Sequence, residues 1–227
     1  SHTHSNSTVD VFQDLTPLQT AVLATEDLKT VELLLEQGVD PNESHAGKKS
    51  ALAIAASAHN FEICSALLKH GASAVRTDDL SAFRYLLKKS RDFDVHDTAA
   101  LVHLFLTERP NDNLQNDLLV YLKYYRLYSL VIQKLLSAGA PLNDQTENGF
   151  TALHITVYDA VAVADDFDSA VYRLNMRTLV LAGADLLAKT TAPATAEDLG
   201  YAVAPPIPAG LTPMDIARTC GSKERQD

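Results

Sequence analysis

The stretch that decides the fold runs from Ser50 to Ala72 and reads SALAIAASAHNFEICSALLKHGA. It opens with a serine, a typical helix N-cap, followed by the small and apolar residues 51–56. Its second half carries Leu67 and Leu68 and then Gly71, a residue type that often ends a helix in the left-handed conformation. The stretch therefore predicts two short helices joined by a tight turn, the first of which is slim enough for close packing.

Both halves of this stretch recur along the chain. The first half returns in three segments that begin with threonine: Thr16–Ala21, Thr151–Ile155 and Thr212–Ala217. The second half returns where leucines or other apolar residues precede a glycine: 33–42, 135–143 and 179–185. Gly38 and Gly71 are 33 residues apart. We infer a tandem array of helix pairs, in which the first helix of each pair is the inner helix and the second is the outer helix.

These motifs resemble the ankyrin repeat, which has a period of about 33 residues and the signature T-P-L-H-x-A. The resemblance covers residues 14 to 217 and implies an all-α ankyrin-repeat solenoid of about six helix-turn-helix repeats. Finger turns such as residues 38–50 would project between the repeats. We expect a flexible segment over 1–10 and one domain over 11–227. The repeats are expected near 14–46, 47–78, 79–111, 112–146, 147–189 and 210–227, with a long loop over 190–209.

The third and fourth repeats lack the motifs and are placed by helix pattern alone. An inner helix from Ser81 should pair with an outer helix capped by Asp97 or Thr98, and helices over 117–125 and 127–137 should form the next pair. The fifth repeat contains about eleven extra residues between its helices. The sixth, from Thr212, has room for an inner helix only, which leaves open both a shortened capping repeat and a longer parent chain.

Composition narrows the classes of function. The chain has 227 residues, with 19 Lys and Arg against 29 Asp and Glu, and a net charge of −10. We therefore expect no binding to nucleic acid or to anionic membranes, both of which attract cationic proteins. Two cysteines, Cys64 and Cys220, exclude a disulfide framework and leave one disulfide open. We expect Cys64 to be buried and Cys220 to be more exposed. We also expect the protein to be intracellular rather than secreted, and a monomer on its own.

No sequence pattern of an enzyme is found. The chain has no nucleophile elbow, glycine-rich phosphate loop or His-Glu-x-x-His helix, so we expect no catalysis, no cofactor and no resident metal. His154 stands at the histidine of the signature, for which the resemblance implies a structural role across the finger turns. The other ligand-type residues lie where they should cap a helix or belong to a polar leader: Asp92, Asp94, His96, Asp97, His2 and His4.

The resemblance implies a non-catalytic module that binds a partner protein through its concave face, formed by finger turns and inner helices. Two alternatives stay open: an inhibitor or immunity protein that occludes an enzyme or toxin, and the scaffold part of a larger enzyme or effector. The net charge favours a partner with a basic surface. An acidic stretch around 159–168 could meet such a partner, or its carboxylates could simply solvate a loop.

Candidate contact residues come from three sources. The first is the alignment of finger and inner-helix positions with the family motif, which is less secure in the third and fourth repeats. The second is the cluster of four tyrosines over 121–128, which cannot all face one helix stripe, so that some should be exposed while others fill the core. The third is the acidic stretch. The expected partner-binding residues are Lys49, Ser57, Arg84, Tyr85, Lys88, Tyr121, Tyr124, Gln145, Glu147, Phe150, Tyr158, Asp159, Asp165 and Asp166.

Overall fold

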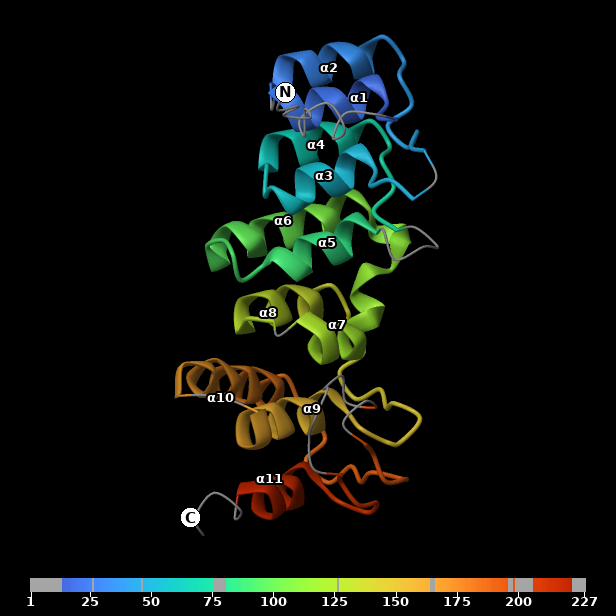
Figure 1. The fold of residues 1–227 in the computed structure, drawn as a ribbon. Coiled ribbons are helices and arrows are strands. Elements are labelled where there is room, and N and C mark those ends of the chain that lie inside the picture. Colours follow the sequence, from blue (N-terminus) through green and yellow to red (C-terminus); the bar gives the residue numbers. More distant parts are fainter. Residues whose placement is uncertain are drawn as a thin grey trace, which may run out of the picture. The chain divides into compact units, whose positions relative to one another are not determined.

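Figure 1 shows the computed structural model of this chain, which describes residues 14–25, 27–45, 47–75, 81–125, 127–163, 166–195, 198 and 206–221. The regular elements of these residues are helices, apart from one isolated antiparallel bridge between Ala194 and Ile207. The chain divides into two compact units, Ser1–Leu114 and Gln115–Asp227. The single domain expected over 11–227 stays a prediction. His2, His4 and the segment 1–10 lie outside the described residues.

The first unit contains three helix pairs among its described residues. The inner helices are α1 (Pro17–Thr20), which continues into the π-helical turn η1 (Ala21–Thr25), α3 (Ala51–Ser57) and α5 (Ala82–Lys89). The outer helices are α2 (Leu28–Glu36), α4 (Phe61–Lys69) and α6 (Val95–Glu108). Two short 3-10 turns follow, η2 (Pro110–Asp112) and η3 (Leu114–Asp117).

Small side chains let the inner helices of the first unit lie close together. Helix α3 packs against both α4 and α5, while α4 contacts α2 on one side and α6 on the other (Figure 1). The four alanines of the motif in α3 are all buried: Ala51, Ala53, Ala55 and Ala56. The outer helix α4 contributes Leu67 and Cys64, both fully buried. A leucine buried in this way stabilises the fold by about 2 kcal/mol, so each pair depends on its neighbours for its core.

The second unit has the same organisation. Its helices are α7 (Leu118–Tyr125), α8 (Ser129–Ser137), α9 (Ala152–Tyr158), α10 (Asp166–Leu181) and α11 (Pro213–Gly221). Helix α9 packs against α7, α10 and α11, and α10 packs against α8. The extra residues of the fifth repeat form the π-helical turn η4 (Asp159–Val163) and lengthen α10, which has 16 residues against 9 in α8. Within the described residues α11 has no outer helix beside it.

The predicted start of the third outer helix is wrong by about one turn. Helix α6 begins at Val95, and the carboxylate of Asp94 caps it by accepting hydrogen bonds from the amides of His96 (2.7 Å) and Asp97 (3.4 Å). Thr98, one of the two expected caps, is buried, and its hydroxyl donates to the Asp94 carbonyl (3.0 Å). Asp94 takes the cap because the apolar stripe of α6 already begins at Val95.

In the first unit, one side chain ties two successive helix pairs together. Gln19 lies three residues after Thr16, the N-cap of α1, and its Oε1 accepts a hydrogen bond from the Thr16 amide (2.7 Å). The Nε2 of the same side chain donates to the carbonyl of Lys49 (2.6 Å), the residue just before Ser50, the N-cap of α3. Gln19 is fully buried, so both bonds are shielded from water.

His154 occupies the corresponding position in the second unit. The Thr151 amide donates to its Nδ1 (3.1 Å), so that nitrogen carries no hydrogen and Nε2 donates to the Leu211 carbonyl (3.1 Å). Leu211 precedes Thr212 as Lys49 precedes Ser50. Burial lowers the pKa of His154, which keeps the ring neutral. These hydrogen bonds give His154 the structural role that the sequence predicts, because they join the start of α9 to the turn before α11.

A second tie joins the outer ends of neighbouring pairs. Asn42 and Asn143 each lie four residues after a helix-ending glycine. The Asn42 Nδ2 donates to the carbonyl of Gly71 (3.1 Å), and the Asn42 Oδ1 accepts a hydrogen bond from the amide of Ser73, two residues after Gly71 (2.7 Å). Asn143 makes the same two bonds around Gly183, at 3.5 and 2.8 Å. The turns after successive outer helices are thus joined side chain to backbone.

Glycines end the outer helices as the motifs predict. The residues that end α2, α4, α8 and α10 have left-handed φ angles of +84° to +95°: Gly38, Gly71, Gly139 and Gly183. Gly149 also has a positive φ (+79°), and a second constraint favours glycine at this position. A Cβ there would lie 2.6 Å from the amide nitrogen of Thr191. That amide donates to the Asn148 carbonyl (2.9 Å), so the backbone of the long loop runs against the finger turn before α9.

The long loop expected over 190–209 is closed at its base. The Thr190 amide donates to the Leu211 carbonyl (2.9 Å), and the Gly210 amide donates to the Thr190 carbonyl (2.8 Å). Further out, Ala194 and Ile207 exchange both backbone hydrogen bonds, at 2.9 and 3.0 Å. The excursion therefore leaves and rejoins the repeat array through one short antiparallel pairing.

Replacing Gly149 by alanine should destabilise the protein more than replacing Gly139 by alanine. Both residues have positive φ, so each change costs about 1 kcal/mol for backbone strain. Only at Gly149 does the new methyl group meet backbone, at Thr191, which adds about 1–3 kcal/mol of overpacking, whereas the space beside Gly139 is open. Urea unfolding of both variants measures the difference. Equal losses would contradict the close approach described here.

Replacing His154 by glutamine should flatten the dependence of stability on pH. The pKa of the folded His154 lies below the ordinary value of about 6.5, so the unfolded chain binds the proton more readily, and the free energy of unfolding falls as the pH drops below about 6.5. Glutamine makes the same two bonds at position 19 without titrating. We expect H154Q to lie within about 1 kcal/mol of the wild type at pH 7 and to lose less stability by pH 5. Parallel pH curves in urea titrations would count against this role.

Candidate interaction surface

The inner helices of the first unit gather basic and aromatic side chains on one surface. We call it the basic face, formed by Lys49, Arg84, Tyr85, Lys88 and Lys89. Helix α5 buries Ala82, Phe83, Leu86 and Leu87 and therefore turns the residues between and after them to its opposite side. Lys49 directly precedes the N-cap of α3, and α3 packs against α5. The packing of these two inner helices therefore builds the basic face.

Lys49 is the centre of this surface. Its Nζ lies 4.1 Å from the ring centroid of Tyr85, within cation–π distance. Partial burial lowers the pKa of Lys49, and the neighbouring charges of Lys88 and Lys89 lower it further. Repulsion among three ammonium groups favours an incoming anion, because a carboxylate there would relieve that repulsion.

The remaining residues predicted for the first unit have local roles or partial exposure. Ser57 is half-buried, and its hydroxyl donates to the Ile54 carbonyl within α3 (2.8 Å). Arg84 and Tyr85 are also half-buried, whereas Lys88 is exposed. The structure thus brings together Lys49, Arg84, Tyr85 and Lys88, and it leaves the hydroxyl of Ser57 engaged in its own helix.

The candidates of the second unit are more scattered. Gln145 and Glu147 are exposed on the finger turn before α9, as expected. Tyr124 on α7 is 57% exposed, and the Nζ of Lys123 lies 5.0 Å from its ring centroid. Asp166 is the first residue of α10, and Asp165 lies outside the described residues. The expected acidic protrusion over 159–168 therefore stays a prediction.

Four candidates are buried and cannot reach a partner in this structure: Phe150, Tyr158, Tyr121 and Asp159. Phe150 packs at the start of α9, with its ring centroid 5.6 Å from that of His154. Burial raises the pKa of Tyr158 to about 12, with further contributions from Cys220 on α11 and from Asp159. The surfaces expected from the family alignment are covered because α11 and η4 pack on α9. Of the tyrosine cluster, Tyr121 fills the core and Tyr124 is exposed.

Two features of the first unit were not predicted. Lys89 belongs to the basic face through its effect on Lys49, and the pair of lysines that ends α5 was the available signal. His59, with φ +53°, stacks on Phe93 at a centroid distance of 3.8 Å, and its Nε2 lies 3.2 Å from the Thr98 hydroxyl. Burial lowers the pKa of His59 to about 4. No sequence motif signals this contact between the second and third pairs.

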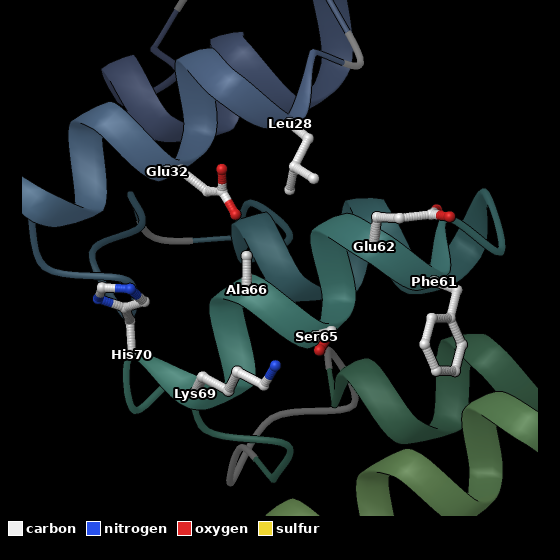
Figure 2. A pocket seen from close by; sticks show the side chains of 8 residues that line it. All are labelled: Leu28, Glu32, Phe61, Glu62, Ser65, Ala66, Lys69 and His70. Atoms are coloured by element: carbon white, nitrogen blue, oxygen red, sulfur yellow. The ribbon is translucent and has the colours of Figure 1, made fainter.

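Figure 2 shows a shallow groove of about 280 Å³ between the outer helices α2 and α4. Leu28 and Glu32 of α2 reach towards α4, which contributes the other side. The lining mixes both charges with apolar groups: Leu28, Glu32, Phe61, Glu62, Ser65, Ala66, Lys69 and His70. Glu32 and Glu62 carry the opposite charge to Lys69, so the groove lacks the single-sign character of the basic face.

Reactive chemistry has little support in the described residues. They contain no group of three or more His, Cys, Asp and Glu side chains placed to hold a metal ion. Cys64 is a free thiol, and burial raises its pKa, so it stays protonated and unreactive at neutral pH. Cys220 forms no disulfide either and is less buried than Cys64, as expected. None of the described helices combines the length and apolar character needed to cross a membrane.

Comparisons with known proteins agree with this architecture. A family model described as ankyrin repeats (3 copies) matches residues 2–78 and, in a second alignment, residues 18–99. No curated protein sequence matches the chain. A solved structure described as the crystal structure of EF0377, an ankyrin repeat protein, is similar with a TM-score of 0.61. The similarity covers 91% of this chain and 93% of that one at 19% sequence identity, which shows the fold alone.

Sequence motifs, helix pairs and fold therefore lead to one assignment. The inner helices α1, α3 and α9 start at capped Thr or Ser residues, and the outer helices α2, α4, α8 and α10 end at left-handed glycines. Side chains tie neighbouring pairs together within each unit. The family match lies in residues 2–99, and the structural likeness extends over nearly the whole chain. Residues 2–99 of this chain match the ankyrin-repeat family model, and the chain has the all-α ankyrin-repeat fold.

Proposed function

We propose that this chain is a non-catalytic module that captures a partner protein through the inner helices of its first unit, with the basic face as the centre of contact. Ankyrin repeats are in general protein–protein interaction modules, typically without catalytic activity. The observation that carries the proposal is the Lys49 ammonium held over the Tyr85 ring beside Lys88 and Lys89. Partners of ankyrin repeats usually bind on the side of the inner helices, which supports this choice of surface.

The chemistry of this surface indicates what the partner contributes there. The basic face concentrates positive charge on a chain whose net charge is −10. A carboxylate of the partner would be attracted to Lys88 and Lys49, and the Tyr85 ring offers a rigid apolar contact beside them. Such complementarity raises the association rate more than the affinity. The proposed contact is therefore an acidic patch with an apolar or aromatic neighbour.

The other expectations about function stay predictions. A partner with a basic surface would be met by Glu147 on the finger turn of the second unit, and not by the basic face. An inhibitor or immunity role, and a scaffold role within a larger enzyme or effector, are both compatible with a binding module. Identification of the partner separates these possibilities, because it names the protein that the basic face holds.

The double change of Lys88 to glutamate and Tyr85 to alanine should abolish most of the binding. Charge reversal and loss of the aromatic contact together should cost about 2 kcal/mol or more, which is roughly a 30-fold loss of affinity. Partners are first found by affinity capture with cross-linking and mass spectrometry. The dissociation constant of each purified partner is then measured for the wild type and the variant, with thermal unfolding as a test that the fold is intact.

Lys29 to glutamate is the matched control. Lys29 is an exposed lysine of the same unit, but it lies on the outer helix α2. The control should bind within about two-fold of the wild type, because exposed charges distant from a contact affect affinity little. Equal binding by the wild type and the double variant would refute the assignment of the basic face.

A further inference from the structure

The second unit exposes several large apolar residues on α10 and on the turn that follows it. Leu174, Val180 and Leu181 of α10 are all exposed, Leu181 by 76%. Directly after the turn at Gly183, Leu186 and Leu187 are exposed as well, Leu187 by 80%. We call these five residues the end face. Large exposed apolar residues that are rimmed by polar ones are typical of interaction sites.

The end face is a particular property of α10 and not of outer helices in general. The preceding outer helix of the same unit, α8, exposes Gln133 and Ser137. Helix α6 of the first unit exposes His103 and Thr107 along its length. Helix α10 buries one side against α8 and α9, and its opposite side carries Leu174 and Leu181, seven residues apart, on one stripe. Helices α6 and α8 expose polar residues here, whereas α2 and α4 each expose one large apolar residue, Leu33 and Phe61.

The described neighbours of α10 cover only part of its surface. Helix α10 packs against α8, and within the described residues no outer helix lies beyond it, because α11 packs on α9 and η4 instead. The exposed stripe of α10 can receive a helix that carries an apolar stripe of its own and lies along α10 as α8 does.

Leu187 argues against a further ankyrin repeat as that occupant. Asn42 and Asn143, four residues after Gly38 and Gly139, bind the glycine turn of the next pair. Leu187 lies four residues after Gly183, at the corresponding position, and its side chain can make no such bond. The turn after α10 is thus suited to an apolar contact rather than to the polar tie that joins one repeat to the next.

The charges beside the end face define the polar side of the occupant. Arg173 and Arg177 lie four residues apart on the exposed side of α10, and Lys189 follows Leu187. Among the described residues no carboxylate lies within ion-pair distance of either arginine. A second copy of this chain, docked face to face, would bring arginine against arginine, which is unfavourable. Carboxylates on the occupant would complement both.

We propose that the end face binds an amphipathic helix of another protein, one with a stripe of leucine-like residues flanked by Glu or Asp. The leucines of α10 would receive the apolar stripe, and Arg173 and Arg177 would pair with the flanking carboxylates. This site belongs to the second unit and is independent of the basic face of the first unit, so the chain has two separate binding surfaces.

The test uses a display library of 18-residue helices with fixed leucines at i, i+3 and i+7 spacing and random polar residues between them. Helices selected on the full chain should be enriched in Glu and Asp at the positions flanking the leucines. Synthetic copies should bind in fluorescence anisotropy, and the change of Leu174 and Leu181 to glutamine should weaken that binding at least 10-fold. Reversal of Arg173 and Arg177 to glutamate should weaken it similarly and favour helices rich in lysine.

Two control variants isolate the site. Leu33 to glutamine removes an exposed leucine from α2, an outer helix of the first unit, and should leave helix binding unchanged. Lys88 to glutamate, which weakens the basic face, should also leave it unchanged. Helices that carry no excess of carboxylates, or that bind the Leu174 and Leu181 variant as tightly as the wild type, would overturn the proposal. So would a dimer in light scattering that the same variant converts to monomer, because the occupant would then be a second copy.

Discussion

In each unit, one buried side chain fixes the position of a helix pair relative to the next pair. It forms a hydrogen bond with the N-cap residue of its own helix and another with the backbone of the next repeat. Gln19 and His154 do this with different chemistry, an amide in one unit and a neutral imidazole in the other. Each satisfies an amide at a helix start and a carbonyl in a neighbouring turn, which would otherwise be buried without partners. Helix start, turn and stacking are therefore fixed by one contact.

The surfaces of the molecule follow from this stacking. The alanines of α3 let α5 pack closely against it, and the side of α5 away from the core carries Tyr85, which is half-buried, and Lys88, which is exposed. Within each unit, neighbouring outer helices pack against one another: α2, α4 and α6 in the first unit, and α8 and α10 in the second. Helix α10 has such a neighbour on one flank, and on the other it carries exposed leucines beside two arginines. Both binding proposals are consequences of how repeats cover one another.

Most of the fold could be predicted from the sequence because its signals are local. Caps at Thr16, Ser50 and Thr151, and glycines with positive φ at the helix ends, determine their own conformations within a few residues. The cap of α6 was misplaced because aspartates at 92, 94 and 97 compete for one role. Exposure is not a local property: Tyr158 is buried on α9, against which the later helix α11 packs, and the motif at Thr151 does not encode that contact.

The closed base of the excursion after Thr190 makes its length independent of the rest of the fold. Backbone hydrogen bonds join Thr190 to Leu211 and Ala194 to Ile207. These bonds fix the two ends of the excursion, and they do not depend on the length of the segment between Ala194 and Ile207. Doubling a flexible loop costs only about 0.6 kcal/mol of closure entropy. Exchange of the segment between Ala194 and Ile207 for another sequence should therefore leave the packing of the helices unchanged.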